Sequence, residues 1–302
     1  MARRPTRTSG GRRKVVAAVN VDCGEAFQKI ALGCVTGIRA HHSSACAGDA
    51  EAVHQIRVAI TRLRSVVAFF APFVADAEWL HLKKEIAWLN TPLGAARDSD
   101  VVVEYARSKQ YRAWAQHGIG ERLEHYQMQD HRRLVRCLRA ARFRRMISAM
   151  ARWIRRGKWL ARWKQSAANG TEPLQAYCER ELNRRRKRLI RNGRNLQTLN
   201  DSRRHRLRIR TKRFRYMLEA LTEIVPVRRR GKFDHVHRPA KRLQRTLGDL
   251  RDLQRFARLA ASLPRTKGDR GKKRPPGYRQ QKEKLLSAAI GAYRDLEQAG
   301  AV

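Results

Sequence analysis

Apolar residues recur at intervals of three and four along most of this chain, which is the spacing of a buried helix face. In the stretch Val53–Phe70, Ile56, Ala59, Leu63, Val66 and Phe70 cluster on one side at about 100° per residue. The same spacing predicts helices over residues 24–42, 76–89, 98–114, 121–160, 174–196, 202–224, 239–263 and 279–298. No segment alternates with period two over several residues, so we predict an all-α fold of two antiparallel bundles in tandem.

Turn-forming residues suggest where these helices begin and end. Asp49 follows a glycine and is expected to cap the helix that contains Val53–Phe70. The sequence Thr91-Pro92-Leu93-Gly94 is expected to interrupt a helix, and Pro226 and Gly231 are expected to bracket a basic loop. The segment 164–173 is the clearest linker, which divides the chain into residues 20–163 and 173–300.

A stripe of basic residues lies beside the apolar face of Val53–Phe70. His54, Arg57, Thr61 and Arg64 are spaced at i, i+3, i+7 and i+10, and therefore share one side of a helix. The pattern recurs 151 residues later in HRLRIRTKRFRYMLEAL. The equivalent positions there are His205, Arg208, Lys212, Arg213 and Arg215.

A second pattern, LGxxRD, follows each basic stripe. It occurs at residues 93–98 and 247–252, an offset of 154 residues. Because two patterns recur in the same order at nearly the same separation, we predict an internal duplication. Gly94 and Gly248 are expected to permit tight helix junctions, and Asp98 and Asp252 to form scaffold ion pairs.

The two basic stripes and the two LGxxRD patterns resemble the conserved histidine α-helical domain, or CHAD domain. The resemblance covers about residues 20–300 and leaves residues 1–19 as a basic, disordered arm. It implies two helical bundles related by a pseudo-twofold axis, with a basic surface between them. It also implies a ligand, inorganic polyphosphate. Such domains occur alone or beside a triphosphate-hydrolysing tunnel domain.

Composition points independently to a polyanionic partner. The chain has 302 residues and a formal net charge of +42, and a compact protein with that charge repels itself. Nucleic acid, polyphosphate and an anionic membrane all offer compensating charge. No apolar run approaches the ~18 residues of a membrane span, and five scattered cysteines suit a reducing compartment, so we expect a cytoplasmic protein.

Guanidinium groups present rigid forks of donors that fit phosphate oxygens, so ladders of arginines suit a linear polyanion. We expect the two ladders to form one groove, with the paired histidines as phosphate hydrogen-bond donors. Tyr216 is a ligand contact or a core residue. The predicted polyphosphate-binding residues are His54, Arg57, Arg62, Arg64, His205, Arg208, Lys212, Arg213, Arg215, Tyr216, Lys241 and Arg245.

Three functions remain open from the sequence. We favour a polyphosphate-binding protein without catalytic residues, metal or cofactor, because no phosphate loop, metal-ligand spacing or ExExK signature occurs. The runner-up is a nucleic-acid-binding protein, with Trp153, Trp159 and Trp163 as stacking platforms, although core packing is the commoner role of such residues. The third is a phosphohydrolase or phosphotransferase that uses His54 and His205. Attachment to polyphosphate granules and self-association are compatible with the first.

Overall fold

The prediction of an all-α fold is confirmed. The computed structural model describes residues 22–115, 119–168, 173–223, 227–262 and 275–301, and every regular element in these ranges is a helix. The predicted arm at residues 1–19 lies outside the described residues. The internal duplication stays a prediction, as do the boundaries of the two repeats.

Two groups of helices form the fold. The first group is α1 (Cys23–Ala40), α2 (His42–Cys46), α3 (Ala50–Phe69), α4 (Ala71–Val74), α5 (Ala77–Arg107), α6 (Arg112–Ala115), α7 (Ile119–Arg139), α8 (Ala141–Arg156) and α9 (Lys158–Ala168). The second group is α10 (Leu174–Gly193), α11 (Asp201–Thr222), α12 (Val227–Ser262) and α13 (Tyr278–Gln298).

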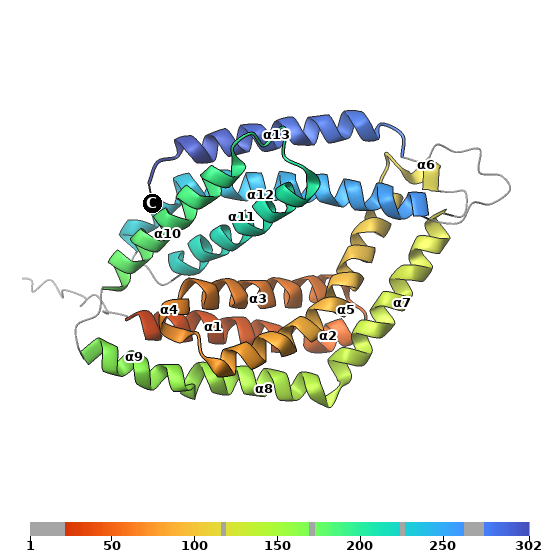
Figure 1. Ribbon diagram of the computed structural model, residues 1–302. Helices are drawn as coiled ribbons and strands as arrows, with labels where there is room; N and C mark the ends of the chain where they lie inside the picture. Colours follow the sequence, from red (N-terminus) through yellow and green to blue (C-terminus); the bar gives the residue numbers. More distant parts are fainter. Residues whose placement is uncertain (1–21, 116–118, 169–172, 224–226, 263–274, 302) are drawn as a thin grey trace, which may run out of the picture.

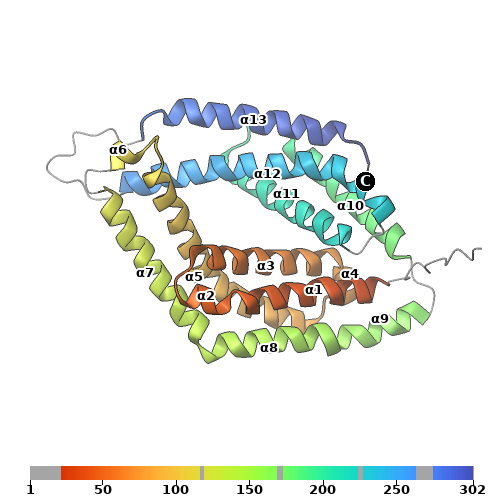
Figure 2. The ribbon, with the colours of Figure 1, turned by 180° about the vertical axis from the view of Figure 1, so that it is seen from behind.

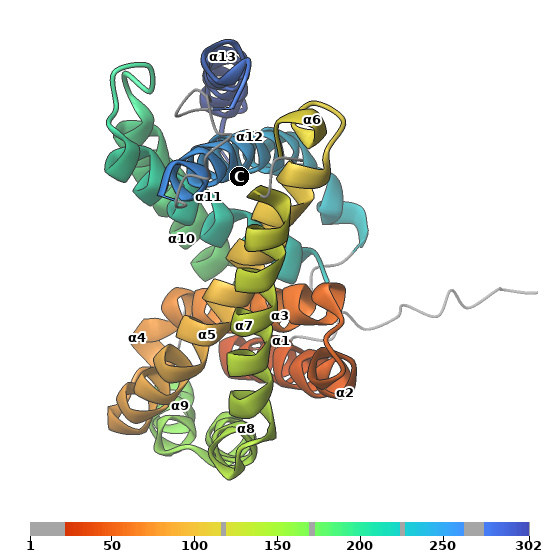
Figure 3. The same cartoon turned by 90° about the vertical axis from the view of Figure 1, so that its right-hand side faces the viewer.

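The two groups lie one above the other, as Figures 1 and 2 show from opposite sides. In Figure 1, α1, α3, α8 and α9 form the lower part and α10–α13 the upper part. Helices α3 and α11 pack against each other where the two parts meet. The paired helices α5 and α7 rise along one side, and α5 packs on α12 (Figure 3). The predicted basic helices are therefore placed face to face at the centre of the molecule.

Helix starts follow the capping residues that the sequence offers. The Asp49 carboxylate accepts a hydrogen bond from the Glu51 backbone N–H at 2.8 Å, so the predicted cap is confirmed. Gly48 precedes it with a φ of +93°, a conformation that glycine adopts without a steric penalty. Asn200 caps α11 in the same way, through a bond from the Arg203 backbone N–H at 2.9 Å. These caps fix where the two basic stripes begin.

The predicted interruption at Thr91–Gly94 is wrong, because α5 continues through Pro92. Leu89, Leu93 and Ala96 are fully buried on one face of α5, and this packing outweighs the single backbone hydrogen bond that proline removes. Helix α12 likewise continues through Pro239. The predicted loop between Pro226 and Gly231 is also wrong, since α12 begins at Val227; Pro226 itself lies outside the described residues.

The long helix predicted over residues 121–160 is divided into α7, α8 and α9. Ala140 and Gly157 have extended backbone conformations, with ψ near 150°, and separate these helices. At Gly157 a Cβ atom would stand 2.5 Å from the Trp153 carbonyl oxygen, so this turn requires glycine. The predicted linker at 164–173 begins too early, because α9 extends to Ala168; residues 169–172 lie outside the described residues.

The three tryptophans of this region are core residues, which is the commoner of the two roles considered for them from the sequence. Trp153, Trp159 and Trp163 are at most 3% exposed. The ring of Phe27 meets the rings of Trp153 and Trp159 edge to face, with centroids 5.7 and 5.0 Å apart. The Trp159 indole N–H donates to the Trp153 carbonyl oxygen at 2.9 Å. These rings are therefore not presented to solvent as stacking platforms.

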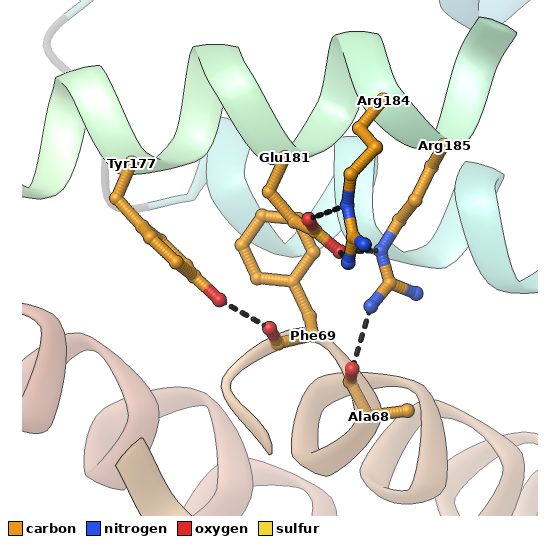
Figure 4. Close-up of polar contacts among 6 residues, drawn as sticks. All are labelled: Ala68, Phe69, Tyr177, Glu181, Arg184 and Arg185. Atoms are coloured by element: carbon orange, nitrogen blue, oxygen red, sulfur yellow. Dashed lines mark hydrogen bonds and ion pairs between the residues drawn. The ribbon is translucent and has the colours of Figure 1, made fainter. Parts of the chain in front are cut away.

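Helix α10 holds the end of α3 in place through polar contacts (Figure 4). The Tyr177 hydroxyl donates to the Phe69 carbonyl oxygen at 2.5 Å, and the Arg185 guanidinium donates to the Ala68 carbonyl oxygen. The Glu181 carboxylate, only 3% exposed, accepts hydrogen bonds from Arg184 and Arg185. Unsatisfied carbonyls at the end of α3 thus gain partners from the other group of helices.

Replacing Tyr177 by Phe should lower the free energy of unfolding by about 1–3 kcal/mol, because the Phe69 carbonyl oxygen would lose its buried hydrogen-bond donor. Urea unfolding followed by circular dichroism measures this change. The matched control is Tyr126→Phe, at a side chain that is 45% exposed, where a change within about 0.5 kcal/mol is expected. Equal effects of the two substitutions would contradict the role given to Tyr177.

Candidate anion-binding site

The predicted basic stripes of α3 and α11 meet in a half-buried group of side chains, which we call the central cluster. Helix α3 contributes His54 and Arg57, and α11 contributes His205, Arg208, Lys212 and Arg215. Helices α5 and α12 add Arg97, Arg251 and Arg255. The central cluster therefore consists of His54, Arg57, Arg97, His205, Arg208, Lys212, Arg215, Arg251 and Arg255.

The two glycines of the LGxxRD patterns each lie against an arginine of a basic stripe. A Cβ atom on Gly94 would lie 3.3 Å from the Arg57 guanidinium, and one on Gly248 would lie 3.5 Å from the Arg208 Nε atom. The glycines are within α5 and α12 respectively, so the predicted helix junctions at these positions are wrong. At each position, an arginine of a basic stripe lies close to the backbone of a neighbouring helix.

Each histidine of the stripes lies beside the arginine of an LGxxRD pattern. Burial lowers the pKa of His54, and the nearby Arg97 lowers it further. Burial and Arg251 have the same effect on the pKa of His205. The Nδ1 atoms of both imidazoles are buried, with no hydrogen-bond partner among the described residues. Both rings are thus neutral near pH 7 in the free protein, and each gains a proton more readily when an anion approaches.

Lys212 is the most strongly perturbed cation of the central cluster. Burial lowers its pKa to about 7, and the positive charges of Arg57, Arg208 and Arg215 contribute to the shift. Burial also lowers the pKa of Arg57. Like charges are therefore held close together away from water, and a bound anion would relieve their repulsion.

Acidic residues compensate part of this charge. Asp98 forms an ion pair with Arg255 of α12 at 2.5 Å, which confirms its predicted scaffold role. Asp252 forms no ion pair among the described residues, so the scaffold pair predicted for it is not confirmed. Burial raises the pKa of Asp249 and of Asp252, and nearby arginines oppose this rise. Next to Asp98, Arg255 and His205 the surface is hollowed into a pocket of about 660 Å³ between α5, α7, α11 and α12.

One end of the central cluster is fixed by a polar network. The Arg215 guanidinium donates to Gln244 at 2.5 Å and to Glu219 at 2.6 Å. His237 lies 3.0 Å from the same Glu219 carboxylate. Tyr216 is only 3% exposed, and its ring centroid lies 4.6 Å from the Arg215 guanidinium carbon. The tyrosine is thus a core residue beneath the cations and supports their positions.

The structure separates some predicted residues from the central cluster. Arg62 forms an ion pair with Glu223, at 2.7 Å, across the contact between α3 and α11. Burial lowers the pKa of Arg213, and its basic neighbours are Arg64, Arg185 and Arg210, none of which belongs to the central cluster. Arg64 and Arg213 therefore lie together at a different place from Arg57 and Lys212.

The remaining two predicted residues are exposed on α12. Lys241 and Arg245 share a helical stripe with Gly248 and Arg255, because these positions are spaced by four, three and seven residues. They extend the basic surface of the central cluster along α12.

Three residues of the central cluster were absent from the predicted set: Arg97, Arg251 and Arg255. The sequence contained a signal for two of them, because Arg97 and Arg251 occupy the same position in the repeated LGxxRD pattern. The pattern by itself does not show whether these arginines contact a ligand or only the protein scaffold. Arg255 lies one helical turn beyond Arg251, and only its ion pair with Asp98 across α5 and α12 reveals its place.

The described residues contain neither a candidate metal site nor a candidate membrane-spanning helix. No group of three or more His, Cys, Asp or Glu side chains there could hold a metal ion. None of the described helices is long and apolar enough to cross a membrane.

Comparison with known proteins identifies related folds. A family model described as "CHAD domain" matches residues 29–261. The crystal structure of the CHAD domain from the plant Ricinus communis is similar, with a TM-score of 0.70 and 22% identity over 94% of this chain and 95% of that chain. PptA from Streptomyces chartreusis has a TM-score of 0.60 and 14% identity, over 92% of this chain and 99% of that chain. No curated protein matches the sequence.

Proposed function

This chain belongs to the CHAD domain family, and on that premise we propose that it binds inorganic polyphosphate through the central cluster. We propose a binding domain and not an enzyme. Binding the polymer would also bring the protein to polyphosphate granules in the cytoplasm.

The observation that carries this proposal is the crowding of cations around Lys212. Its pKa is lowered to about 7 by burial and by Arg57, Arg208 and Arg215, which come from two different helices. A protein gains no stability from holding like charges together out of water. A ligand that supplies negative charge along its whole length offsets this cost, and polyphosphate is such a ligand.

The geometry of α3 and α11 suits a linear polymer. Arg57 projects from α3, and Arg208, Lys212 and Arg215 form a stripe on α11 in which neighbouring side chains are about 5–6 Å apart. Guanidinium groups bind phosphate oxygens with two parallel hydrogen bonds, which adds geometric selectivity to charge. The exposed Lys241 and Arg245 offer further contacts to a long chain on the surface of α12.

Nucleic acid is the competing ligand, because the net charge of +42 attracts any polyanion. The test is a titration of the protein with long-chain polyphosphate and with single-stranded RNA of equal charge, at two salt concentrations. Both affinities should fall with salt, because cations are released from either polymer. We expect polyphosphate to keep a preference of at least tenfold at the higher salt.

Equal or stronger RNA binding at the higher salt would overturn the proposal. Charge alone would then explain the attraction to polyanions, and nucleic acid would be the better-supported ligand. The buried positions of Trp153, Trp159 and Trp163 argue against base stacking on these rings.

A further inference from the structure

A second set of arginines lies on the side of α11 that faces away from the central cluster. Arg203, Arg206 and Arg210 are spaced at i, i+3 and i+7 and share one stripe. Each lies two positions from a residue of the central cluster, which turns it about 200° around the helix axis. The sequence pattern had not singled out these three residues.

These arginines line a pocket with the end of α10. Arg191, Asn192 and Arg194 complete the polar lining, and the pocket has a volume of about 390 Å³. No carboxylate is among the lining residues. Pockets for small ligands commonly have volumes of about 300–1,000 Å³, so this hollow is large enough for a small, compact anion.

The five guanidinium groups of this pocket have no ion-pair partner among the described residues. None of Arg191, Arg194, Arg203, Arg206 and Arg210 is within salt-bridge distance of a described carboxylate. The adjacent Arg204, by contrast, forms an ion pair with Asp201 at 3.4 Å. Five unpaired cations around one hollow repel each other, and that repulsion favours an anion between them.

The scaffold of the pocket is held by packing and hydrogen bonds. The Tyr293 hydroxyl donates to the Ile190 carbonyl oxygen at 2.8 Å, and its ring lies against Gly193 where a Cβ atom would clash. Asn195 has a φ of 57°, in the left-handed region, and turns the chain at the end of α10. The Arg204 guanidinium donates to the Gln197 carbonyl oxygen at 3.0 Å. The backbone that carries the arginines is thus fixed before any ligand binds.

We propose that this pocket is a second anion-binding site, separate from the central cluster, that takes closely spaced phosphate groups. Arginine forks from two helices converge on a small hollow, so the ligand must carry several phosphates within a short distance. A free small molecule such as a triphosphate has this chemistry, and so does the end of a long polyphosphate chain. The inference does not depend on binding at the central cluster.

The test is calorimetric titration with inorganic tripolyphosphate. In the variant Arg203→Glu/Arg206→Glu we expect binding at the pocket to weaken at least tenfold, because two exposed donors are replaced by repelling charges. The matched control is Arg279→Glu/Arg294→Glu, which makes the same charge change at exposed positions of α13 outside the pocket. Arg206→Ala, which adds no negative charge, should weaken binding in the same direction to a smaller extent.

A titration with long-chain polyphosphate shows whether the pocket binds a free triphosphate or the polymer. A second variant shows whether the pocket binds independently of the central cluster. If only the long polymer loses affinity in Arg203→Glu/Arg206→Glu, the pocket binds phosphates of the polymer. In Arg57→Glu/Arg208→Glu the pocket should still bind tripolyphosphate, whatever happens at the central cluster. The proposal is overturned if Arg203→Glu/Arg206→Glu binds both probes as tightly as the α13 control does.

Discussion

Replacing Arg57 and Arg208 together by glutamate is expected to weaken polyphosphate binding by at least about 100-fold. The two side chains come from α3 and α11, and both lie beside Lys212 at the centre of the cluster. Each hydrogen bond to a charged group contributes about 1.5–3 kcal/mol, and 1.4 kcal/mol is a tenfold change in affinity. The introduced carboxylates would also repel the polymer. Fluorescence titration with long-chain polyphosphate measures the change.

The matched control for this prediction is Arg152→Glu/Arg155→Glu. It makes the same change in net charge at two exposed positions of α8, which lies away from α11 and α12 (Figure 1). We expect its affinity to fall less than about fivefold, through weaker long-range attraction alone.

Equal losses in the two double variants would show that binding depends on net charge and not on the central cluster. Circular dichroism must show unchanged helicity in both proteins. Arg57→Gln/Arg208→Gln provides a second test in which no carboxylate is placed near Asp98, the acidic neighbour of Arg57.

Polyphosphate affinity is expected to fall as the pH rises from 6 to 8.5. The pKa of Lys212 is about 7 in the free protein, so the amine loses its proton across this range. A bound anion stabilises the charged form and raises this pKa, so binding takes up a proton above pH 7 and weakens as protons become scarce. The pKa values of His54 and His205 are also lowered, so protonation of these imidazoles makes polyphosphate affinity depend on pH in the same direction at lower pH.

The variant Lys212→Arg tests this explanation, because arginine stays charged throughout the range. Its affinity should change much less above pH 7 than that of the native protein. Long-chain polymer is the required probe, since its internal phosphates keep a constant charge. An unaltered pH dependence in Lys212→Arg would contradict the role of the lysine.

The stability of the free protein should show the opposite trend with pH. In the unfolded chain Lys212 keeps its proton up to about pH 10.4, whereas in the folded protein it loses the proton near pH 7. The unfolded state therefore binds more protons between these values, and this lysine makes the folded state more stable as the pH rises. The urea midpoints of unfolding at pH 7 and pH 9 should differ less in Lys212→Met than in the native protein, because methionine has no proton to lose.

Helix faces were predictable because burial imposes a period on the sequence. The apolar positions of α3, including Ile56, Leu63 and Val66, are buried as the spacing required. Helix ends were less predictable. Pro92 does not end α5, because packing on either side of it continues. Gly157 follows α8 in an extended conformation, and a Cβ atom there would meet the Trp153 carbonyl oxygen and the rings of Trp153 and Trp159. Whether a turn-forming residue ends a helix thus depends on the packing around it, which the local sequence does not contain.

The sequence by itself determined the all-α class, the two basic stripes and the identity of the residues at their centre. Those properties depend on residue type and on spacing within one helix, which the sequence contains directly. Only the tertiary structure decided which cations share a site. It joined Arg97, Arg251 and Arg255 to the stripes, and it separated Arg213 from Lys212, its neighbour in the chain. Adjacent residues of a helix point about 100° apart, so the packing of helices around α11 determines the neighbours of each.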